Sequence, residues 1–279
     1  MPRARPAGVL VVDDDRVMRH LTRSVLQKAG FRVRVAKDGV EATKQLRAGK
    51  FDLMLLDLWM PRMNGLAVLD RLTRFKRAPK VIMLTSDDAP ETLLSVMKKR
   101  AHQFVHKPID PTELVSLVTN AINAGPQPPI DVVSARPDWV ELSVPCTRNA
   151  ADRINGVMAH LDADLPEAVR ESISYAFREL LLNAVEWGGR LDPKRRVRIS
   201  YVRAKRMVIY RIADPGPGFK IDELAHAAIN HPDNPIGHMD VREQKGMRPG
   251  GFGILMVRAK VDELIYNEAR NEVMFVKYL

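Results

Sequence analysis

The N-terminal part of the chain alternates between short apolar runs and longer amphipathic stretches. The apolar runs begin near Gly8, Phe31, Phe51, Lys80 and Gln103, and each is followed by a stretch with helical periodicity. An unbroken apolar run is typical of a strand that is buried on both faces, and strands that alternate with helices form parallel sheets. The pattern therefore predicts an α/β fold, a doubly wound five-stranded parallel sheet covered by helices on both faces.

Polar residues stand where the predicted strands end. Asp13 and Asp14 follow the first strand, Asp57 ends the third, Thr85 ends the fourth and Lys107 follows the fifth. In a doubly wound sheet these positions meet at the carboxyl edge, where ligands bind. Carboxylates that share one cleft repel each other unless a divalent cation lies among them, and the lysine and hydroxyl can hold an anion. We therefore expect a Mg²⁺ site at which a nucleophilic carboxylate, Asp57, takes a phosphoryl group.

Residues 7–124 resemble the receiver domain of bacterial two-component response regulators. The matching residues are Asp13-Asp14, Asp57 with Met60-Pro61 and Asn64-Gly65, Thr85-Ser86, and Lys107-Pro108. The resemblance implies that Asp57 is the phospho-acceptor and that Asp13, Asp14 and the Trp59 carbonyl bind Mg²⁺ beside it. It also implies that Thr85 and Phe104 take the switch positions, that Lys107 binds the phosphoryl group, and that a histidine kinase is the phosphodonor.

The chain is long for a single core, and its middle is rich in proline. Gly125-Pro-Gln-Pro-Pro129 is typical of a stiff linker, and Arg136-Pro-Asp138 is a second break in regular structure. We therefore predict a first domain over residues 1–124, a linker over 125–138 and a second domain over 139–279. The second domain has the pattern of an α+β sandwich, with helices on one face of an antiparallel sheet.

A carboxylate and an amide share one face of a predicted helix in the second domain. Glu179 and Asn183 are four residues apart in the stretch that ends at Gly188, and the leucines between them can pack on a sheet. A carboxylate can deprotonate a hydroxyl, and an amide oxygen can hold Mg²⁺. Taken alone, the pair is equally well explained as a solvated polar stripe.

Two glycine-rich loops follow this helix. Asp214 ends an apolar run and precedes Gly216 and Gly218, whereas Gly251 and Gly253 precede a second predicted helix. Glycines let a backbone approach a ligand closely, and a helix N-terminus suits phosphate. Three such elements in this order favour a nucleotide site.

Residues 139–279 resemble the ATP-binding domain of the GHKL superfamily, which includes histidine kinases and the anti-sigma factor serine kinases. The resemblance rests on Glu179-x-x-x-Asn183-Ala, Asp214-x-Gly-x-Gly218 and Gly251-x-Gly253. It implies that Asn183 coordinates Mg²⁺, that Asp214 accepts the adenine amino group, and that Glu179 is the general base. Gly216 and Gly218 would shape the pocket, and Gly251 and Gly253 would border the phosphates of ATP. One departure is Trp187, where the serine kinases usually have histidine.

These resemblances favour a response regulator whose output domain is an ATP-dependent serine/threonine kinase. Its expected partners are an anti-sigma factor antagonist, a sigma factor or both, with a possible homodimer. The alternative is a non-catalytic module that binds ATP and sequesters a partner. A self-contained histidine kinase is not expected, because the region before the ATP-binding domain is too short for the acceptor hairpin and His160 lacks its usual acidic neighbour.

The formal net charge is +10, and most of the excess lies in residues 1–124. A basic half can indicate nucleic acid, but these cations are spread over several elements without interleaved aromatic residues, so a generally basic surface is favoured. We expect no membrane span or signal peptide, and the single cysteine is compatible with a reducing cytoplasm. The segment between Phe219 and Arg248 is predicted to form a lid over the nucleotide rather than a zinc site.

Overall fold

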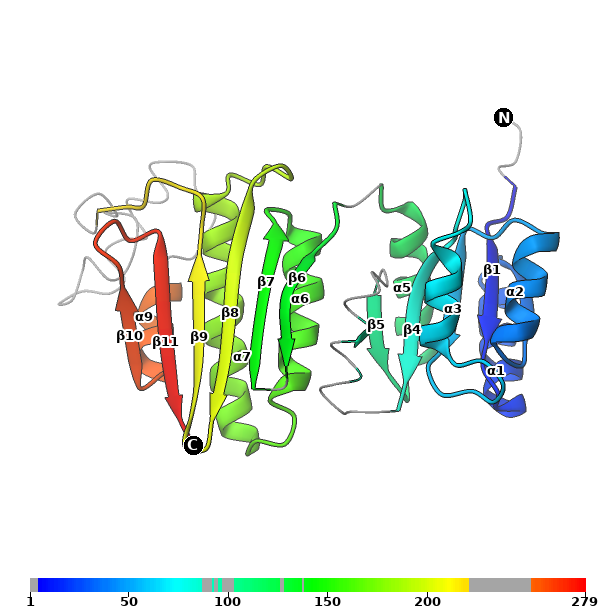
Figure 1. The fold of residues 1–279 in the computed structure, drawn as a ribbon, viewed down its shortest axis with the longest axis horizontal. Helices are drawn as coiled ribbons and strands as arrows, with labels where there is room; N and C mark the ends of the chain where they lie inside the picture. Colours follow the sequence, from blue (N-terminus) through cyan, green and yellow to red (C-terminus); the bar gives the residue numbers. More distant parts are fainter. Residues whose placement is uncertain are drawn as a thin grey trace. The chain divides into compact units, whose positions relative to one another are not determined.

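The computed structural model describes residues 5–86, 92, 95–96, 103–125, 128–136, 138–220 and 252–279. The chain divides into two compact units, Met1–Gln127 and Pro128–Leu279, each with its own sheet (Figure 1). Gly251, the greater part of the predicted lid and most of the helix predicted over residues 90–100 lie outside the described residues.

The first unit is a five-stranded parallel sheet with the strand order β2-β1-β3-β4-β5. Its strands are β1 (Gly8–Val12), β2 (Arg32–Ala36), β3 (Leu53–Asp57), β4 (Lys80–Thr85) and β5 (Gln103–His106). Its described helices are α1 (Arg16–Lys28), α2 (Gly39–Ala48), α3 (Gly65–Leu72) and α5 (Pro111–Asn123). Because the order reverses beside β1, the sheet is doubly wound, and this prediction is confirmed.

The central strands of this sheet bury both faces in separate hydrophobic cores. Leu10, Met54 and Leu56 point into a core that they share with α2 and α3, together with Met83. Their neighbours along the strands, such as Leu55, point into a second core that contains α1 and α5. Successive strand residues face opposite sides of a sheet, so a strand buried on both faces must be apolar throughout. This explains why the strands are unbroken apolar runs.

The second unit is a six-stranded sheet with the order β10-β11-β9-β8-β7-β6, and every described neighbour pair is antiparallel. Its strands are β6 (Asp131–Arg136), β7 (Trp139–Pro145), β8 (Arg196–Ala204), β9 (Met207–Ala213), β10 (Glu263–Tyr266) and β11 (Glu272–Tyr278). Its described helices are α6 (Arg148–Leu161), α7 (Glu167–Asn183), a π-helical turn η1 (Ala184–Gly188) and α9 (Gly253–Lys260). Figure 1 shows α6, α7 and α9 together on one face of this sheet, which confirms the predicted α+β arrangement.

An aromatic cluster joins this sheet to α7. The ring of Tyr210 lies 5.0 Å from those of Phe177 and Tyr201 and is stacked 4.9 Å from that of Phe275. Both tyrosine hydroxyls donate to the buried carboxylate of Asp162, at 3.0 Å from Tyr201 and 2.8 Å from Tyr210. Burial raises the pKa of Asp162 to about 6, although these two hydrogen bonds act to lower it. The cluster anchors the helix that carries Glu179 and Asn183.

The predicted linker over residues 125–138 needs a correction, because residues 131–136 form β6 at the edge of the second sheet. This strand pairs with β7 through a register that shifts between Val132 and Ser134. Arg196 holds it in place by donating to the Pro129 carbonyl and, at 2.7 Å, to Asp131. Prolines on either side made the segment look like a linker, whereas the side-chain contact that holds it comes from a distant strand.

Candidate functional sites

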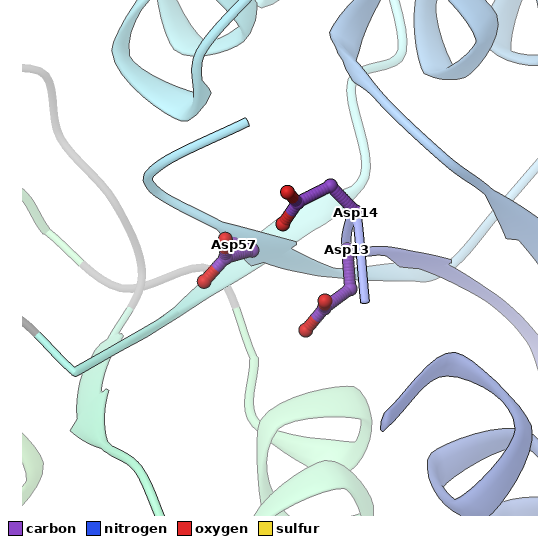
Figure 2. Close-up of side chains that lie close together, drawn as sticks. All are labelled: Asp13, Asp14 and Asp57. Carbon is purple, nitrogen blue, oxygen red and sulfur yellow. The ribbon is translucent and has the colours of Figure 1, made fainter. Parts of the chain in front are cut away.

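Three carboxylates meet at the carboxyl edge of the parallel sheet. Val12 of β1 pairs with Leu56 of β3, so Asp13 and Asp57 come directly after paired residues on adjacent strands. One oxygen from each of Asp13, Asp14 and Asp57 lies within 4.8 Å of the others (Figure 2). The sheet register therefore brings together the acidic residues that the sequence analysis selected.

The three consecutive aspartates after β1 differ in their burial and in their hydrogen bonds. Asp13 is buried, and its carboxylate accepts the backbone N–H of Asp15 at 2.8 Å. Asp14 is exposed, and Asp15 caps α1 by accepting the N–H groups of Val17 and Met18. Arg19 donates to the Asp13 carbonyl at 2.7 Å. Asp15 therefore belongs to the helix cap, and Asp13 and Asp14 are the two that remain for a cation.

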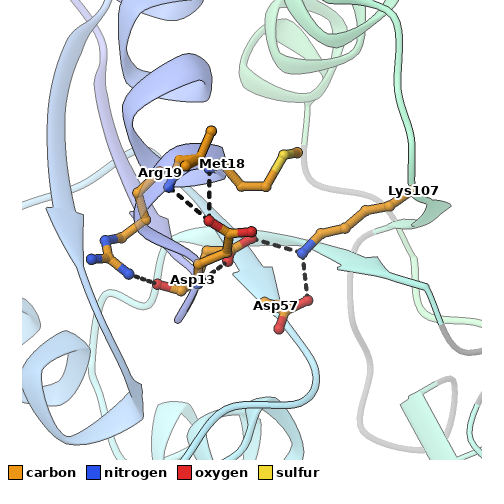
Figure 3. A network of polar contacts seen from close by, with 7 residues as sticks. Asp13, Met18, Arg19, Asp57 and Lys107 are labelled. Carbon is orange, nitrogen blue, oxygen red and sulfur yellow. Dashed lines mark hydrogen bonds and ion pairs between the residues drawn. The ribbon is translucent and has the colours of Figure 1, made fainter.

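Lys107 lies between the two buried carboxylates. Its ammonium group donates to Asp13 Oδ2 and to Asp57 Oδ1, each at 2.7 Å (Figure 3). Burial raises the pKa of Asp57, Lys107 acts to lower it, and Asp13 and Asp14 raise it further. Burial also acts to lower the pKa of Lys107, but its hydrogen bonds to the two carboxylates outweigh this and leave the pKa raised. Lys107 is therefore firmly protonated at neutral pH.

The donor set of this site fits Mg²⁺. Three carboxylates face one ammonium group, so the cluster retains excess negative charge. Hard oxygen ligands of this kind suit a small divalent cation, which also relieves the repulsion among them. Asp13, Asp14 and Asp57 are the residues that would hold it.

Thr85 and Phe104 lie where the sequence analysis expected the switch residues. Thr85 ends β4 and is buried, and its carbonyl accepts the Lys107 N–H at 2.8 Å. Phe104 on β5 is half-buried against the core that contains α2 and α3. Thr85 therefore stands at the end of the strand beside β3, whereas Phe104 lies near the start of β5 and pairs with Met83.

The loop after Asp57 is held by two contacts, one of which sequence reasoning missed. Gly65 donates its N–H to the Leu58 carbonyl, and a Cβ at this position would lie 2.5 Å from the Asp57 carbonyl oxygen. Arg62 forms an ion pair with the buried Asp38, which also caps α2. The Asp38-x-x-Glu41 spacing of a capping box was the available signal for Asp38. The pairing with Arg62 had no sequence signal.

In the second unit, Glu179 and Asn183 face the start of α9. A Cβ added to Gly253, the first residue of α9, would lie 2.6 Å from Glu179 Oε2 and 4.0 Å from Asn183 Nδ2. The two helices also meet through the ammonium group of Lys260, which lies 5.4 Å from the centre of the Tyr175 ring. Three of the predicted nucleotide-site residues therefore lie together at the start of α9.

Asp214 is packed against the turn that follows Asn183. A Cβ on Gly188 would lie 2.1 Å from Asp214 Oδ1, and one on Gly216 would lie 2.7 Å from the same atom. The Gly216 N–H donates to this oxygen at 2.7 Å. Burial raises the pKa of Asp214, which the hydrogen bond from Gly216 and the positive charge of Arg195 act to lower. The Gly216 N–H therefore holds the Asp214 carboxylate, and a side chain at position 188 would displace that carboxylate.

Arg195 ties the two parts of this arrangement together, and sequence reasoning missed it. Its guanidinium donates to the Gly188 carbonyl at 3.1 Å and to the Pro215 carbonyl at 2.8 Å. Gly188 ends the π-helical turn η1, and such turns are frequent at functional sites. Arg195 therefore fixes the end of the helix that carries Asn183 against the loop that carries Asp214.

Gly218 shapes the same loop from its far end. Its φ is +85°, and a Cβ there would lie 1.6 Å from the Ala269 carbonyl oxygen. Only glycine fits both the backbone conformation and the space. Trp187, the departure from the serine-kinase pattern, has an exposed side chain.

Comparisons with known proteins assign the two halves to two families. Residues 9–119 match the response regulator receiver domain, and residues 145–277 match the histidine kinase-like ATPase domain. The DNA-binding response regulator MtrA of Mycolicibacterium paratuberculosis is 31% identical over 201 residues, which cover 71% of this chain and 88% of MtrA. This chain is a response regulator. Its receiver is followed by a histidine kinase-like ATPase domain, as the two resemblances implied.

Solved receiver structures are also similar to this response regulator. The chemotaxis response regulator CheY4 of Vibrio cholerae is 30% identical, with a TM-score of 0.39, and the match covers 42% of this chain and 99% of that one. A response regulator from Chloroflexus aurantiacus is 28% identical, with a TM-score of 0.41, and the match covers 43% of this chain and all of that one. Among the described residues, no helix is both long and apolar enough to cross a membrane.

Replacing Lys107 with methionine tests the electrostatics of the acidic cluster. We expect Lys107→Met to raise the pKa of Asp57, because burial and the charges of Asp13 and Asp14 remain while the lowering effect of Lys107 is lost. A carboxylate with a raised pKa is less ionised at a given pH, so phosphorylation by acetyl phosphate should slow by at least about tenfold and its pH profile should move upward. Carbon NMR of the Asp57 carboxyl in Mg²⁺-free buffer measures the pKa directly. Lys28→Met is the control, and an unchanged Asp57 pKa in Lys107→Met would contradict this account.

Proposed function

We propose that this response regulator is an ATP-dependent protein serine/threonine kinase of the anti-sigma factor type, controlled by phosphorylation of Asp57. In this proposal residues 1–124 are the phospho-acceptor domain, and the second unit, Pro128–Leu279, is the kinase domain. The observation that carries it is the placement of Glu179 and Asn183 against Gly253 at the start of α9. A base, a metal ligand and a helix N-terminus that meet in this way suit the transfer of a phosphoryl group to a hydroxyl.

In the receiver, Asp57 would accept a phosphoryl group from a histidine kinase. A carboxylate oxygen of Asp57 forms a bond to phosphorus, and the bond from phosphorus to the histidine nitrogen of the donor breaks. Mg²⁺, when bound, supplies positive charge to the phosphoryl oxygens. Lys107 would move from its contact with Asp57 Oδ1 to one of these oxygens, since both are anionic acceptors. The hydroxyl of the buried Thr85 would donate to another.

In the ATPase domain, we assign Asp214 to the adenine amino group. The N–H of Gly216 holds Oδ1, which leaves Oδ2 without a partner among the described residues. Asn183 would hold Mg²⁺ through its amide oxygen, and Gly253, with Gly251, would border the phosphates. Glu179 would deprotonate the serine hydroxyl, whose oxygen attacks the γ-phosphorus as the bond to the β-phosphate oxygen breaks.

The proposed substrate is a serine of a small anti-sigma factor antagonist, and a sigma factor and a second copy of the chain are further candidate partners. This rests on the pattern of Glu179, Asn183 and Asp214 that the chain shares with anti-sigma factor kinases. A cytoplasmic location fits ATP as co-substrate and Cys146, which is buried and free. We do not extend to this chain the DNA binding in the name of MtrA, because residues 145–277 match an ATPase domain instead.

Substitution of Gly188 tests whether Asp214 recognises the nucleotide. We expect Gly188→Ala to weaken ATP binding by at least about tenfold, because the new Cβ would lie 2.1 Å from Asp214 Oδ1 and must push the carboxylate aside. Gly156→Ala is the matched control, since a Cβ at that helical position meets nothing within 4 Å. Isothermal titration calorimetry with Mg²⁺ and ATP measures both. Equal affinities in the two variants would contradict the assignment of Asp214.

Substitution of Glu179 separates catalysis from binding. We expect Glu179→Gln to bind ATP about as well as the wild type but to lose phosphoryl transfer to serine by about 100-fold or more, because a general base contributes roughly 10²–10⁴-fold. Asn183→Ala should lose both ATP binding and phosphoryl transfer, since the proposed metal ligand is removed. Glu171 is an exposed glutamate on the same helix, and Glu171→Gln should change neither ATP binding nor phosphoryl transfer.

The assay uses full-length protein, Mg²⁺, radiolabelled ATP and the candidate antagonist. Full transfer by Glu179→Gln would contradict its role as base. No transfer by the wild type, combined with partner binding that requires ATP, would instead support the non-catalytic binding module.

A further inference from the structure

Four basic residues of the receiver gather between two of its helices. Two adjoining hollows of about 470 and 430 Å³ lie between α2 and α3, and both are lined by Thr43, Arg47 and Arg71. Lys44 lines the first hollow and Arg74 the second. We call this continuous feature the α2–α3 groove.

Two rows of cations flank the α2–α3 groove. Lys44 and Arg47 are three residues apart on α2, so they project from one side of that helix. Arg71 stands in the last turn of α3, and Arg74 follows just after the helix, where its N–H donates to the Arg71 carbonyl at 3.1 Å. All four side chains are exposed. Among the residues that the structure describes, none of the four has a carboxylate within ion-pairing distance. Like charges gathered in this way repel each other, and an anionic occupant would remove that repulsion.

Helix electrostatics account for only part of this charge. Arg47 and Arg71 each stand in the last turn of a helix, where a cation is favoured by the helix dipole. Lys28 takes the same position on α1, which packs on the opposite face of the sheet, and it lines neither hollow. The dipole therefore explains one cation at each helix end, but not two facing rows.

The groove also exposes apolar surface between the cations. Val40 is 42% exposed and lines the first hollow with Ala48, whereas Phe75 is half-buried and lines the second. A nucleic-acid backbone offers only phosphate and sugar to such a floor. An amphipathic protein segment offers carboxylates to the two rows and an apolar side chain to the floor between them. The mixture of charge and apolar surface therefore favours a protein segment.

The cations Arg47 and Arg71 mark the end of the groove that lies away from the acidic cluster. α2 and α3 end at the edge of the sheet where β3 and β4 begin, whereas Asp13 and Asp57 stand at the carboxyl ends of β1 and β3. A segment bound at this end of the groove would leave the acidic cluster open to a phosphodonor. We propose that the α2–α3 groove is a docking site for an acidic amphipathic segment of a partner protein.

A synthetic peptide of repeated Glu-Glu-Leu units tests the proposal on the full-length protein. Fluorescence anisotropy should show saturable binding that weakens with added salt, because exposed charges are screened. We expect the double variant Arg47→Glu, Arg71→Glu to bind the peptide at least about tenfold more weakly. The matched control is Arg23→Glu, Lys28→Glu on α1, which makes the same change in net charge and also alters a last-turn cation. It should bind within about twofold of the wild type.

Two further probes distinguish an amphipathic protein segment from a purely acidic segment and from a nucleic acid. The same peptide with serine in place of leucine should bind at least about fivefold more weakly, because it cannot fill the apolar floor. A single-stranded oligonucleotide of equal charge should compete poorly. Equal loss in the groove and control variants, equal binding of the serine peptide, or stronger binding of the oligonucleotide would each overturn the proposal. Unchanged acetyl phosphate labelling of Asp57 shows that the variants fold.

Discussion

The receiver site depends on one buried ammonium group shared between two carboxylates. Lys107 bridges Asp13 and Asp57, which follow adjacent strands, so it links the fifth strand of the sheet to the first and third. Two buried carboxylates this close are costly without a compensating cation. Lys107 compensates only part of the charge, because Asp14 adds a third carboxylate. The cluster therefore retains excess negative charge, which favours the binding of a divalent cation.

The ATPase domain also contains a carboxylate that is partly removed from water, but no lysine contacts it among the described residues. Asp214 is partly buried and is held by the Gly216 N–H, while glycine at position 188 lets the end of η1 approach its carboxylate. Arg195 donates to the Gly188 carbonyl on η1 and to the Pro215 carbonyl beside Asp214. Its positive charge also favours the ionised form of the Asp214 carboxylate. Each domain therefore removes a carboxylate at least partly from water and stabilises it with nearby hydrogen-bond donors. In the receiver we assign this carboxylate to a cation site, and in the ATPase domain to a nucleotide base.

Much of this could be predicted from the sequence, for reasons of periodicity. Apolar runs at strand length and alternating helices specify the parallel sheet, and the sheet places Asp13 and Asp57 at one edge whatever the details of the loops. The helix period puts Glu179 and Asn183 on one face. Predictions of this kind depend on the local residue pattern and on the order of the elements, and both can be identified in the sequence.

The features that were missed depend on contacts between distant segments. Gly188 is an ordinary helix-ending glycine until Asp214 is packed against it, and Arg195 is an ordinary surface arginine until its two carbonyl partners are placed. Strand β6 looked like part of a linker because the contacts that hold it come from other segments. It pairs with β7, and Arg196 of β8 donates to Asp131 at its start. The α2–α3 groove was hidden for the same reason, since Arg47 and Arg71 become neighbours only when two helices pack.

The central claim is that one chain contains two separate pockets that handle phosphoryl groups. Phosphorus NMR of the full-length protein with Mg²⁺, ATP and acetyl phosphate tests both pockets in a single sample. The account predicts a protein aspartyl-phosphate resonance, distinct from that of free acetyl phosphate, that disappears in Asp57→Asn, together with shifted or broadened ATP resonances that persist in that variant. Free-solution ATP resonances in the wild type, or a protein-bound aspartyl-phosphate resonance that survives Asp57→Asn, would contradict it.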